Sequence, residues 1–442
     1  MSPDQIAAIV MMSLLLTMVI CGVHLAFALF FLSMIFGLIF QGPAIFSMSM
    51  LKIFGTMESE ILIAVPLFVF MGTILEKSDV AEGVYQSLYE LFGPIRGGLA
   101  FATVITCTVF ASCTGVIAAT VTTMTLLAVP SMLKRKYDKG LATGVVCAGG
   151  SLGILIPPSV MLVMYGPMAN LSVAQLFAAA LFPGLLLSVL YLLYIGFGSW
   201  LKPALAPAIQ EQERKHKGAK LWGRAALMMV PSMFLIIAVL GSIIAGIASP
   251  TEASGVGAFS ALIIAAAYRK LTYTNVKEAA YTTLIVTAMV FFIIIGASIF
   301  NSVFLYLGGG ALIKSLLMGL PLGKWFVLFV MMFVLFILGF FISWQGLLYV
   351  VVPIFLPVAT NLGFNPLWFG LLICLNLQMS FLTPPFAYAI FFVKGASPPE
   401  VNTWDIYRGV IPFVILQAIA VFLCIVFPEI ILWLPKVTLG AG

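Results

Sequence analysis

Hydroxyl-bearing residues stand where long apolar segments of the chain are interrupted. Ser112 and Thr114 lie in the sequence FASCTG, Ser343 in FISWQG and Thr383 in SFLTPP. Hydroxyl and main-chain oxygens are the ligands that hard cations such as Na⁺ prefer. No Asp or Glu lies at these interruptions, although a proton-coupled carrier commonly places a carboxylate there. The residue types therefore favour Na⁺ over H⁺ as the bound ion.

Two pairs of adjacent prolines break apolar segments in which a continuous membrane helix would otherwise be expected. Pro157 and Pro158 end the sequence GGSLGILIPP, and Pro384 and Pro385 end SFLTPP. Each proline removes a backbone donor, and the glycines before the first pair favour irregular backbone. Inside a bilayer such backbone persists only where protein or a water-filled cavity satisfies it. Paired breaks in two halves of a chain indicate the binding site of a secondary transporter.

The composition is that of a helical membrane protein. Hydrophobic residues make up 63% of the 442 residues and charged residues only 8%, a balance that excludes a water-soluble domain. We expect an all-α polytopic membrane protein in a lipid bilayer. Nucleic acid is not expected as a partner, because the net charge of +6 comes from short clusters and not from a basic domain.

Clusters of basic residues predict the orientation of the chain. They lie, in order along the sequence, at 134–139, 214–224 and 269–277. The positive-inside rule places all three in the cytoplasm, which puts both termini in the periplasm. The apolar segment 95–133 must then enter and leave the membrane on one side, as a re-entrant hairpin with its tip near Ser112. The same reasoning makes 322–358 a re-entrant hairpin from the opposite side.

Equal spacings relate the two halves of the chain. Pro130 precedes Pro157 by 27 residues, and Pro357 precedes Pro384 by the same number. The two expected hairpin tips share the pattern F-x-S-x-x-G. Because the halves also have opposite expected orientations, the sequence predicts an inverted structural repeat.

The repeats and their connections divide the chain into four parts. These are a first inverted repeat at 1–166, a connecting helix with a cytoplasmic linker at 167–224, a second inverted repeat at 225–393 and a C-terminal helix at 394–442. Each repeat contains a re-entrant hairpin followed by a broken helix, at 95–133 and 141–165 in the first and at 322–358 and 368–393 in the second.

Other polar residues in the apolar segments have structural interpretations first. Asn301 and Asn376 are expected to form hydrogen bonds between helices, with pocket lining as the second interpretation. Ser249, Pro250 and Glu252 match a capping box that begins a helix. No ATPase, hydrolase or metalloprotease motif occurs in the sequence, so we expect neither an enzyme nor an organic cofactor.

In four stretches the chain resembles the large membrane subunit (DctM type) of TRAP transporters, the tripartite ATP-independent periplasmic transporters. The matching stretches are GSLGILIPPS, KYDKG, GIASPTEA and LTPP. The resemblance implies a multi-pass protein of the bacterial inner membrane that imports a small organic acid anion, a carboxylate or a sulfonate, by a Na⁺-driven elevator motion. It also implies two partners, a small membrane subunit and a periplasmic substrate-binding protein.

The resemblance further implies the residues of three sites. One Na⁺ would be held at the first tip and first break by Ser112, Thr114, Gly115, Gly153, Ile156 and Pro157. A second Na⁺ would be held at the second tip and break by Ser343, Gly346, Ser380, Thr383 and Phe386. The substrate would lie between the tips, where the candidate contacts are Ser112, Thr114, Ser343, Trp344, Gln345, Asn376 and Thr383.

The chain departs from the family's usual pattern at these sites. Ser380 stands where glycine is common, and Phe386 and Ala387 follow LTPP where a valine-glycine pair is common. Two alternatives stay open. One is a single-chain Na⁺/dicarboxylate-type symporter that works without a binding protein. The other, from a different class, is a channel or a passive membrane anchor.

Overall fold

The computed structural model describes residues 2–115, 117–208, 219–320, 322–385 and 387–440. All regular structure in these ranges is helical, and they contain no strand, so the predicted all-α fold is confirmed. Eight of the described helices are long and apolar enough to cross a membrane, or nine if one bent pair forms a single span. The chain is therefore a polytopic membrane protein.

Five helices precede the first expected hairpin: α1 (Pro3–Ile20), α2 (Leu25–Gln41), α3 (Ala44–Met57), α4 (Ala64–Glu76) and α5 (Val80–Phe92). A capping box begins α1, in which the Ser2 hydroxyl accepts from the Gln5 N–H and the Gln5 side chain accepts from the Ser2 N–H, so two free donors of the first turn are satisfied. A 56° bend separates α3 from the segment that contains α4. These helices lead the chain to the first hairpin.

Four helices form the segments predicted as the first hairpin and the first broken helix. They are α6 (Gly98–Thr114), α7 (Ile117–Lys134), α8 (Lys139–Ser151) and α9 (Val160–Ala169). A 3₁₀ turn, Leu152–Ile154, extends α8 toward the break. The side chain of Asp138 accepts a hydrogen bond from the Leu141 N–H at 2.9 Å and so satisfies a free donor at the start of α8.

Long helices connect the two hairpin regions: α10 (Val173–Leu201), α11 (Ala219–Ile236), the short α12 (Ser242–Ile244), α13 (Pro250–Ala267) and α14 (Tyr273–Tyr306). The predicted capping box at the start of α13 is confirmed. The Ser249 hydroxyl accepts from the Glu252 N–H at 3.2 Å, and the Glu252 carboxylate accepts from the Ser249 N–H at 2.7 Å. Both bonds satisfy donors that the helix leaves free, so Glu252 has a structural role.

Helix α15 (Gly309–Met318) precedes the second hairpin, whose helices are α16 (Gly323–Leu338) and α17 (Trp344–Asn361). The second broken helix follows as α18 (Pro366–Ser380) and α19 (Tyr388–Ala396). The interruption of the second hairpin lies at 339–343 and so begins before the FISWQG sequence in which the tip is expected. The difference arises because Gly339 ends α16 and Ser343 is already the N-cap of α17, with an extended ψ of 148°.

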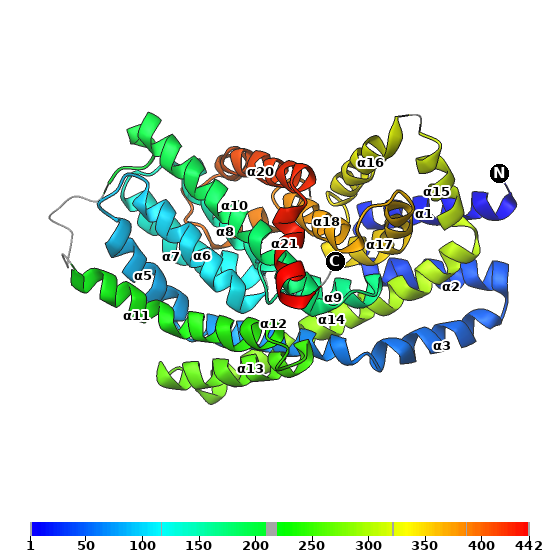
Figure 1. The fold of residues 1–442 in the computed structure, drawn as a ribbon, viewed down its shortest axis with the longest axis horizontal. Helices are drawn as coiled ribbons and strands as arrows, with labels where there is room; N and C mark the ends of the chain where they lie inside the picture. The colour runs from blue at the N-terminus through cyan, green and yellow to red at the C-terminus, as the bar shows by residue number, and fades with distance from the viewer. Residues whose placement is uncertain (1, 116, 209–218, 321, 386, 441–442) are drawn as a thin grey trace.

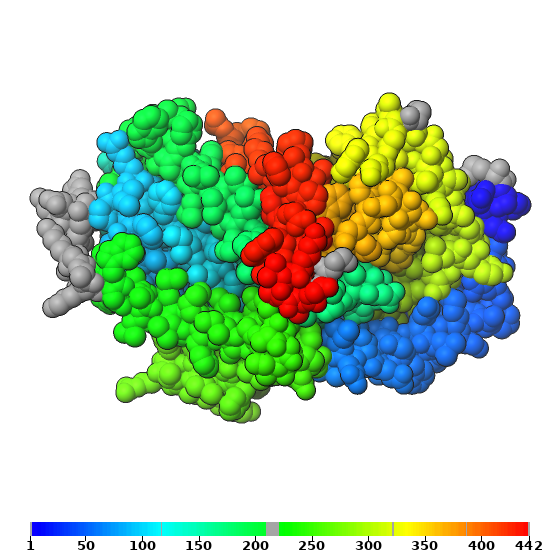
Figure 2. All heavy atoms as spheres, viewed as in Figure 1, coloured from blue at the N-terminus to red at the C-terminus, as the bar shows by residue number. Residues whose placement is uncertain are grey.

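The C-terminal segment forms two helices, α20 (Thr403–Val426) and α21 (Glu429–Leu439), and not the single helix expected within 394–442. Pro428 explains the interruption, because a residue that precedes a proline avoids the helical conformation. Phe427 accordingly has φ −119° and ψ 77°. Helix α21 packs against α10 and crosses the middle of the face shown in Figure 2.

The helices form two groups along the long axis of the molecule (Figure 1). Helices α2, α3, α11, α13 and α14 form the lower group in this view, and the hairpins and broken helices lie above them. We call α2, α4, α13 and α14 the scaffold, because α14 packs against α2 and α4 and α13 packs against α4. Helix α14 also packs against α17, so it forms the boundary between the two groups.

The two hairpin regions exchange contacts reciprocally. Helix α9, the second half of the first broken helix, packs against α17 of the second hairpin, and α19, the second half of the second broken helix, packs against α7 of the first. The first halves stay with their own hairpins, α8 against α6 and α7 and α18 against α16 and α17. Inverted repeats would pack in this way, although the repeat itself stays a prediction.

Two asparagines inside the apolar helices join neighbouring elements. Asn301 Nδ2 donates to the Tyr349 carbonyl at 2.5 Å, between α14 and α17. Asn376 Nδ2 donates to the Met332 carbonyl at 2.6 Å, between α18 and α16. The predicted interhelical role is confirmed for both residues, because an amide within an apolar bundle is stabilised by a partner on another helix.

Candidate functional site

The first hairpin tip packs against the first helix break. Helix α6 ends at Gly115, which has a left-handed φ of +60° that glycine adopts without steric cost. A Cβ built on Gly115 would lie 3.1 Å from the Pro158 carbonyl oxygen, and one built on Gly153 would lie 3.7 Å from the Ala111 Cα. The tip and the break therefore meet through main-chain atoms. Val116, which completes the tip, lies outside the described residues.

Main-chain oxygens are free at the first break. The Pro157–Pro158 peptide bond is cis, and the Ser159 hydroxyl donates to the Ile154 carbonyl. The Ile156 and Pro157 carbonyls accept no hydrogen bond from the part of the chain that the structure describes. Both residues are buried. Free carbonyl oxygens in such a position are suitable ligands for a hard cation.

Ser112 and Thr114 place two hydroxyls in the last turn of α6, the helix whose end packs against the break. Ser112 Oγ donates to the Thr108 carbonyl at 3.0 Å, and Thr114 Oγ1 lies 2.9 Å from Thr120 Oγ1 across the hairpin. A hydroxyl that donates its proton keeps lone pairs with which it can coordinate a cation. The structure thus brings the six residues predicted for the first Na⁺ to the junction of α6 with the first break.

Two hydroxyls at the second tip and break have no hydrogen-bond partner among the described residues. They belong to Ser343 and Ser380, and both oxygen atoms are buried. Ser343 is the N-cap of α17, yet its side chain makes no capping bond. Leaving a buried hydroxyl unpaired costs about 1–3 kcal/mol. Buried polar atoms that lack a hydrogen-bond partner indicate a site for a bound ion or water.

Ser380 lies against the end of the second hairpin's first helix. A Cβ built on Gly339 would lie 2.0 Å from Ser380 Oγ, so the hydroxyl fills the space that a side chain there would take. Thr383 Oγ1 donates to the Met379 carbonyl at 3.1 Å and keeps its lone pairs free. Ser343 and Pro385 line one cavity. The structure therefore brings Ser343, Ser380 and Thr383 to the second tip and break.

The prediction for the second Na⁺ also includes Gly346 and Phe386. A Cβ built on Gly346 would lie 1.8 Å from Leu25 Cδ2, so the Cα of Gly346 packs against α2 of the scaffold, and its role in the second Na⁺ site stays a prediction. Phe386 lies outside the described residues. The next residue, Ala387, has φ +30°, a left-handed conformation that is strained for any residue with a side chain.

A cavity of about 220 Å³ lies where both tips and both breaks meet. The elements around it contribute Gly115 from the first tip, Ile154 from the first break, Trp344 from the second tip, Phe381 from the second break and Met289 from α14. We call it the central cavity. An adjoining cavity of about 480 Å³ shares Met289, Gln345 and Tyr388 with it. The position between the two tips is the one predicted for the substrate.

The predicted substrate contacts divide into three groups. Trp344 and Gln345 line the central cavity, and Ser343 lines the adjoining one. Ser112, Thr114 and Thr383 line neither of them. Asn376 lies elsewhere, on an apolar groove of about 530 Å³ formed with α16 and α20.

Sequence reasoning missed most residues of the cavity walls, among them Met289, Phe381 and Tyr388. Phe381 and Tyr388 flank the second double proline, which is a signal that could have identified them. Met289 lies within the uninterrupted helix α14, and nothing in its sequence neighbourhood distinguishes it from other lipid-facing or core residues.

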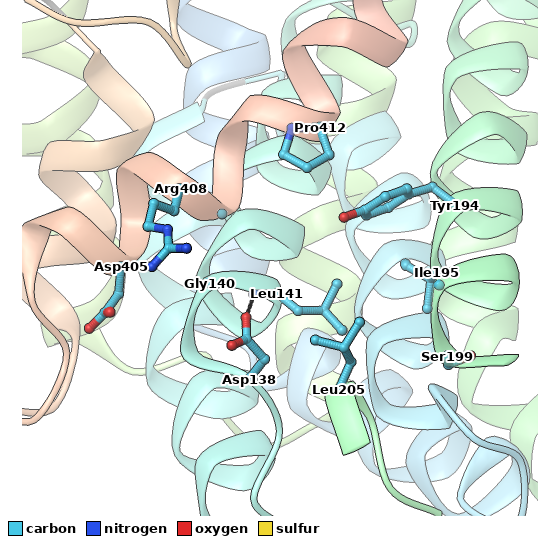
Figure 3. A pocket seen from close by; sticks show the side chains of 12 residues that line it. Asp138, Gly140, Leu141, Tyr194, Ile195, Ser199, Leu205, Asp405, Arg408 and Pro412 are labelled. Atoms are coloured by element: carbon cyan, nitrogen blue, oxygen red, sulfur yellow. Dashed lines mark hydrogen bonds between the residues drawn. The ribbon is translucent and has the colours of Figure 1, made fainter. Parts of the chain in front are cut away.

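A further cavity of about 300 Å³ lies between α8, α10 and α20 (Figure 3). Asp138, Asp405 and Arg408 are the charged residues that line it. Asp138 caps α8, as the dashed line to Leu141 in Figure 3 marks, and Asp405 accepts from the Asn402 N–H at 3.0 Å at the start of α20. Both carboxylates therefore serve as helix caps, and the cavity is separate from the two breaks.

Comparison with known proteins gives one family along almost the whole chain. The family model "Tripartite ATP-independent periplasmic transporter, DctM component" matches residues 8–430. The C4-dicarboxylate TRAP transporter large permease protein DctM of Pseudomonas aeruginosa is 30% identical over 90% of this chain and 91% of its own length. The sialic acid TRAP transporter large permease protein SiaM of Vibrio cholerae is 28% identical over 97% and 98%.

A longer relative and two solved structures are also similar. The isethionate TRAP transporter permease protein DctMQ of Oleidesulfovibrio alaskensis is 30% identical over 85% of this chain and 58% of its own length. The YdaH transporter of Alcanivorax borkumensis superposes with a TM-score of 0.63 over 94% of this chain and 99% of that one, at 14% identity. MtrF of Neisseria gonorrhoeae gives 0.59 over 90% and 85%, at 13% identity. At these identities the two structures show a shared fold.

Proposed function

Since the chain belongs to the DctM family of tripartite ATP-independent periplasmic transporters, and so is a multi-pass protein of the bacterial inner membrane, we propose that it is the large permease subunit of a Na⁺-coupled organic acid importer. The substrate is a small organic acid anion, a carboxylate or a sulfonate. Relatives named for C4-dicarboxylates, isethionate and ectoine support transport of small polar solutes, and not catalysis, as the activity.

The observation that carries the proposal is the meeting of four elements at one cavity. Both hairpin tips and both helix breaks contribute to the walls of the central cavity. Broken membrane helices expose free amides and carbonyls, which bind anions and cations respectively. A substrate in this cavity would therefore lie beside both proposed Na⁺ sites, as coupled transport requires.

The two Na⁺ sites are proposed at the two tip-and-break junctions. At the first, the free carbonyls of Ile156 and Pro157 lie on the break against which the tip with Ser112 and Thr114 packs. At the second, the unpaired hydroxyls of Ser343 and Ser380 are buried. Na⁺ would supply the missing partner to each set of oxygens, which gives the ion a higher affinity for the assembled junctions than for separated ones.

An elevator motion is proposed for the hairpins and broken helices relative to the scaffold. Helix α14 lies along the boundary between the two groups of helices, and it supplies Met289 to the central cavity. A cavity that one moving group and one fixed helix share opens or closes when the moving group slides. Na⁺ and substrate would bias that equilibrium by binding one arrangement more tightly.

We propose two partners, a small membrane subunit and a periplasmic substrate-binding protein. Support comes from the family, which is described as the DctM component of a tripartite transporter. The large subunit would act together with a small membrane chain. The binding protein would deliver the anion to the periplasmic side of the assembly.

The decisive test is uptake by proteoliposomes that contain this chain with its small partner. Carboxylates and sulfonates are supplied with and without a Na⁺ gradient and with and without the cognate binding protein. We expect uptake that needs both. Uptake that needs Na⁺ alone would identify a single-chain type of symporter, and ion currents without saturable uptake would identify a channel. Absence of any Na⁺-dependent uptake would overturn the proposal.

A further inference from the structure

The central cavity has apolar walls. Among its described lining residues there is no Lys, Arg, His, Asp or Glu, and its polar side chains are Gln345 and Tyr388. The other walls are formed by aliphatic and aromatic residues, among them Ile154, Trp344 and Phe381. A site built in this way favours a ligand whose body is apolar, because polar groups of the ligand would lose hydration without gaining partners.

Gln345 is the polar group aimed into this space. Its side chain is only 9% exposed, it lines both the central and the adjoining cavity, and it makes no hydrogen bond with the described residues. It lies in the first turn of the 18-residue helix α17, where backbone N–H groups have no partner within the helix. An amide side chain and a helix N-terminus together form one donor set for one anionic group.

A bound Na⁺ would add a positive charge to this donor set. Ser343, a proposed Na⁺ ligand, precedes Trp344 and Gln345 directly in the chain and lines the adjoining cavity with Gln345. Na⁺ at Ser343 would therefore lie close to an anion at the start of α17. His24, exposed at the start of α2, is the one basic side chain among the described residues that line either cavity.

We propose, on the basis of the function proposed above, that the substrate is a monoanion with a compact apolar body. Its single carboxylate or sulfonate would be held by Gln345 and the first turn of α17. Its body, a ring or a branched chain, would lie between Trp344 and Phe381. A second carboxylate would face apolar walls on which the described lining residues include no Lys, Arg or His, and burying a charge without such a side-chain partner is strongly unfavourable.

The test is binding of three probes to the purified complex of the large and small subunits. Benzoate represents the apolar monoanion, succinate is a dianion at neutral pH, and benzyl alcohol is the neutral analogue of benzoate. Affinities are read from the concentration dependence of thermal stabilisation, with and without Na⁺. We expect benzoate to bind in Na⁺ at least about tenfold more tightly than either of the other two, a difference of about 1.4 kcal/mol.

Each other outcome of this panel overturns the inference. Succinate binding as tightly as benzoate would exclude a monoanion site while leaving a Na⁺-coupled organic acid permease intact. If benzyl alcohol bound as tightly as benzoate, the cavity would bind apolar compounds regardless of their charge. No Na⁺-dependent binding of either anion would refute the assigned site, and the uptake experiment above would then decide the proposed function separately.

Two variants locate the site. Gln345→Leu should weaken benzoate binding at least about tenfold and leave benzyl alcohol unchanged, because only the anion uses the amide. Trp344→Ala should weaken both aromatic probes, whereas Trp325→Ala, on the exposed side of α16 with 53% of its surface accessible, should change neither. Unchanged benzoate affinity in Gln345→Leu would place the anion elsewhere. Na⁺-induced stabilisation in each variant verifies that the protein is folded.

Discussion

The hydroxyl of Ser380 occupies the position that a side chain on Gly339 would take. A Cβ built on Gly339 would lie 2.0 Å from Ser380 Oγ and 2.6 Å from Ser380 Cβ, so the ends of α16 and α18 touch without room for a methyl group. The same Oγ has no hydrogen-bond partner in the described ranges. The second hairpin and the second broken helix therefore meet at a free hydroxyl, whose position depends on glycine at 339.

The first prediction concerns this contact. Gly339→Ala should raise the Na⁺ concentration for half-maximal uptake at least about tenfold, or about 1.4 kcal/mol, because the methyl group displaces the Ser380 hydroxyl. Overpacking should also lower stability by about 1–3 kcal/mol. The control is Gly55→Ala in α3, where a Cβ would meet no atom within 4 Å. A wild-type Na⁺ activation curve for Gly339→Ala would contradict the second Na⁺ site.

The second prediction concerns the stability of two serine variants, which should differ from that of the wild type in opposite directions without and with Na⁺. Ser343→Ala and Ser380→Ala remove buried hydroxyls that lack partners. Without Na⁺ each variant should be as stable as the wild type or more stable, by up to about 1–3 kcal/mol, because an unsatisfied polar group is lost. With Na⁺ each should show a smaller stabilisation, because the ion binds less tightly. Apparent melting temperatures across a Na⁺ titration measure both effects.

The matched control for this pair is Ser33→Ala in the scaffold. Ser33 is fully buried and its hydroxyl donates to the Leu29 carbonyl at 2.5 Å, so it is a paired hydroxyl away from both breaks. Its loss should lower stability equally with and without Na⁺. If Ser343→Ala and Ser380→Ala behaved like Ser33→Ala, their hydroxyls would not be ion ligands.

The third prediction concerns hydroxyls that already donate to a carbonyl. Ser112→Ala and Thr383→Ala should weaken the Na⁺ dependence of uptake more than they weaken folding, because each loses an oxygen whose lone pairs are free. Thr383→Ser should keep the Na⁺ response, whereas Thr383→Val, with nearly the same shape, should lose it. Na⁺ activation of uptake, normalised to the amount of folded protein, separates the variants. An equal response from serine and valine at 383 would remove Thr383 from the site.

The fourth prediction follows from backbone strain. Ala387 has φ +30°, and a left-handed conformation costs a residue with a side chain about 1–2 kcal/mol. Ala387→Gly should therefore raise the apparent melting temperature. The control, Ala389→Gly, lies in α19 two residues later and should lower it, since glycine within a helix costs about 1 kcal/mol relative to alanine. A lower melting temperature for Ala387→Gly would show that the alanine methyl is needed there.

The breaks could be predicted from the sequence because each is encoded locally. Pro157 and Pro384 end helices through their own covalent structure, and the structure places the interruptions at these residues. Ser249 and Glu252 likewise encode a capping box in four residues. Features of this kind need no knowledge of what packs against them.

Features that depend on distant contacts could not be predicted. Gly346 packs on Leu25, more than three hundred residues away in sequence. The hydrogen bond of Asn376 to another helix could be predicted, but its partner, the Met332 carbonyl, could not be. Polar residues such as Lys52 and Glu82 reduce the apolar signal of the segments that form α3 and α5, so neither helix is evident in the sequence. The wall contributed by Met289 of α14 depends on how α14 packs, which no local pattern encodes.

The last prediction tests the elevator motion through accessibility. Phe341 lies in the interruption of the second hairpin and lines the adjoining cavity, so a cysteine there would move with the hairpin. Cys21 is the exposed native cysteine and the other five are buried, so the variant is made together with Cys21→Ser. Na⁺ and substrate should change the rate at which a water-soluble thiol reagent labels Phe341→Cys at least about tenfold, because they shift the population between two arrangements.

The control is the exposed scaffold position Lys277→Cys in the same background, which should be labelled at the same rate with and without Na⁺ and substrate. A rate at 341 that responds to neither ligand would mean that the hairpin stays fixed against the scaffold, and transport would then need a smaller local gate at the tips.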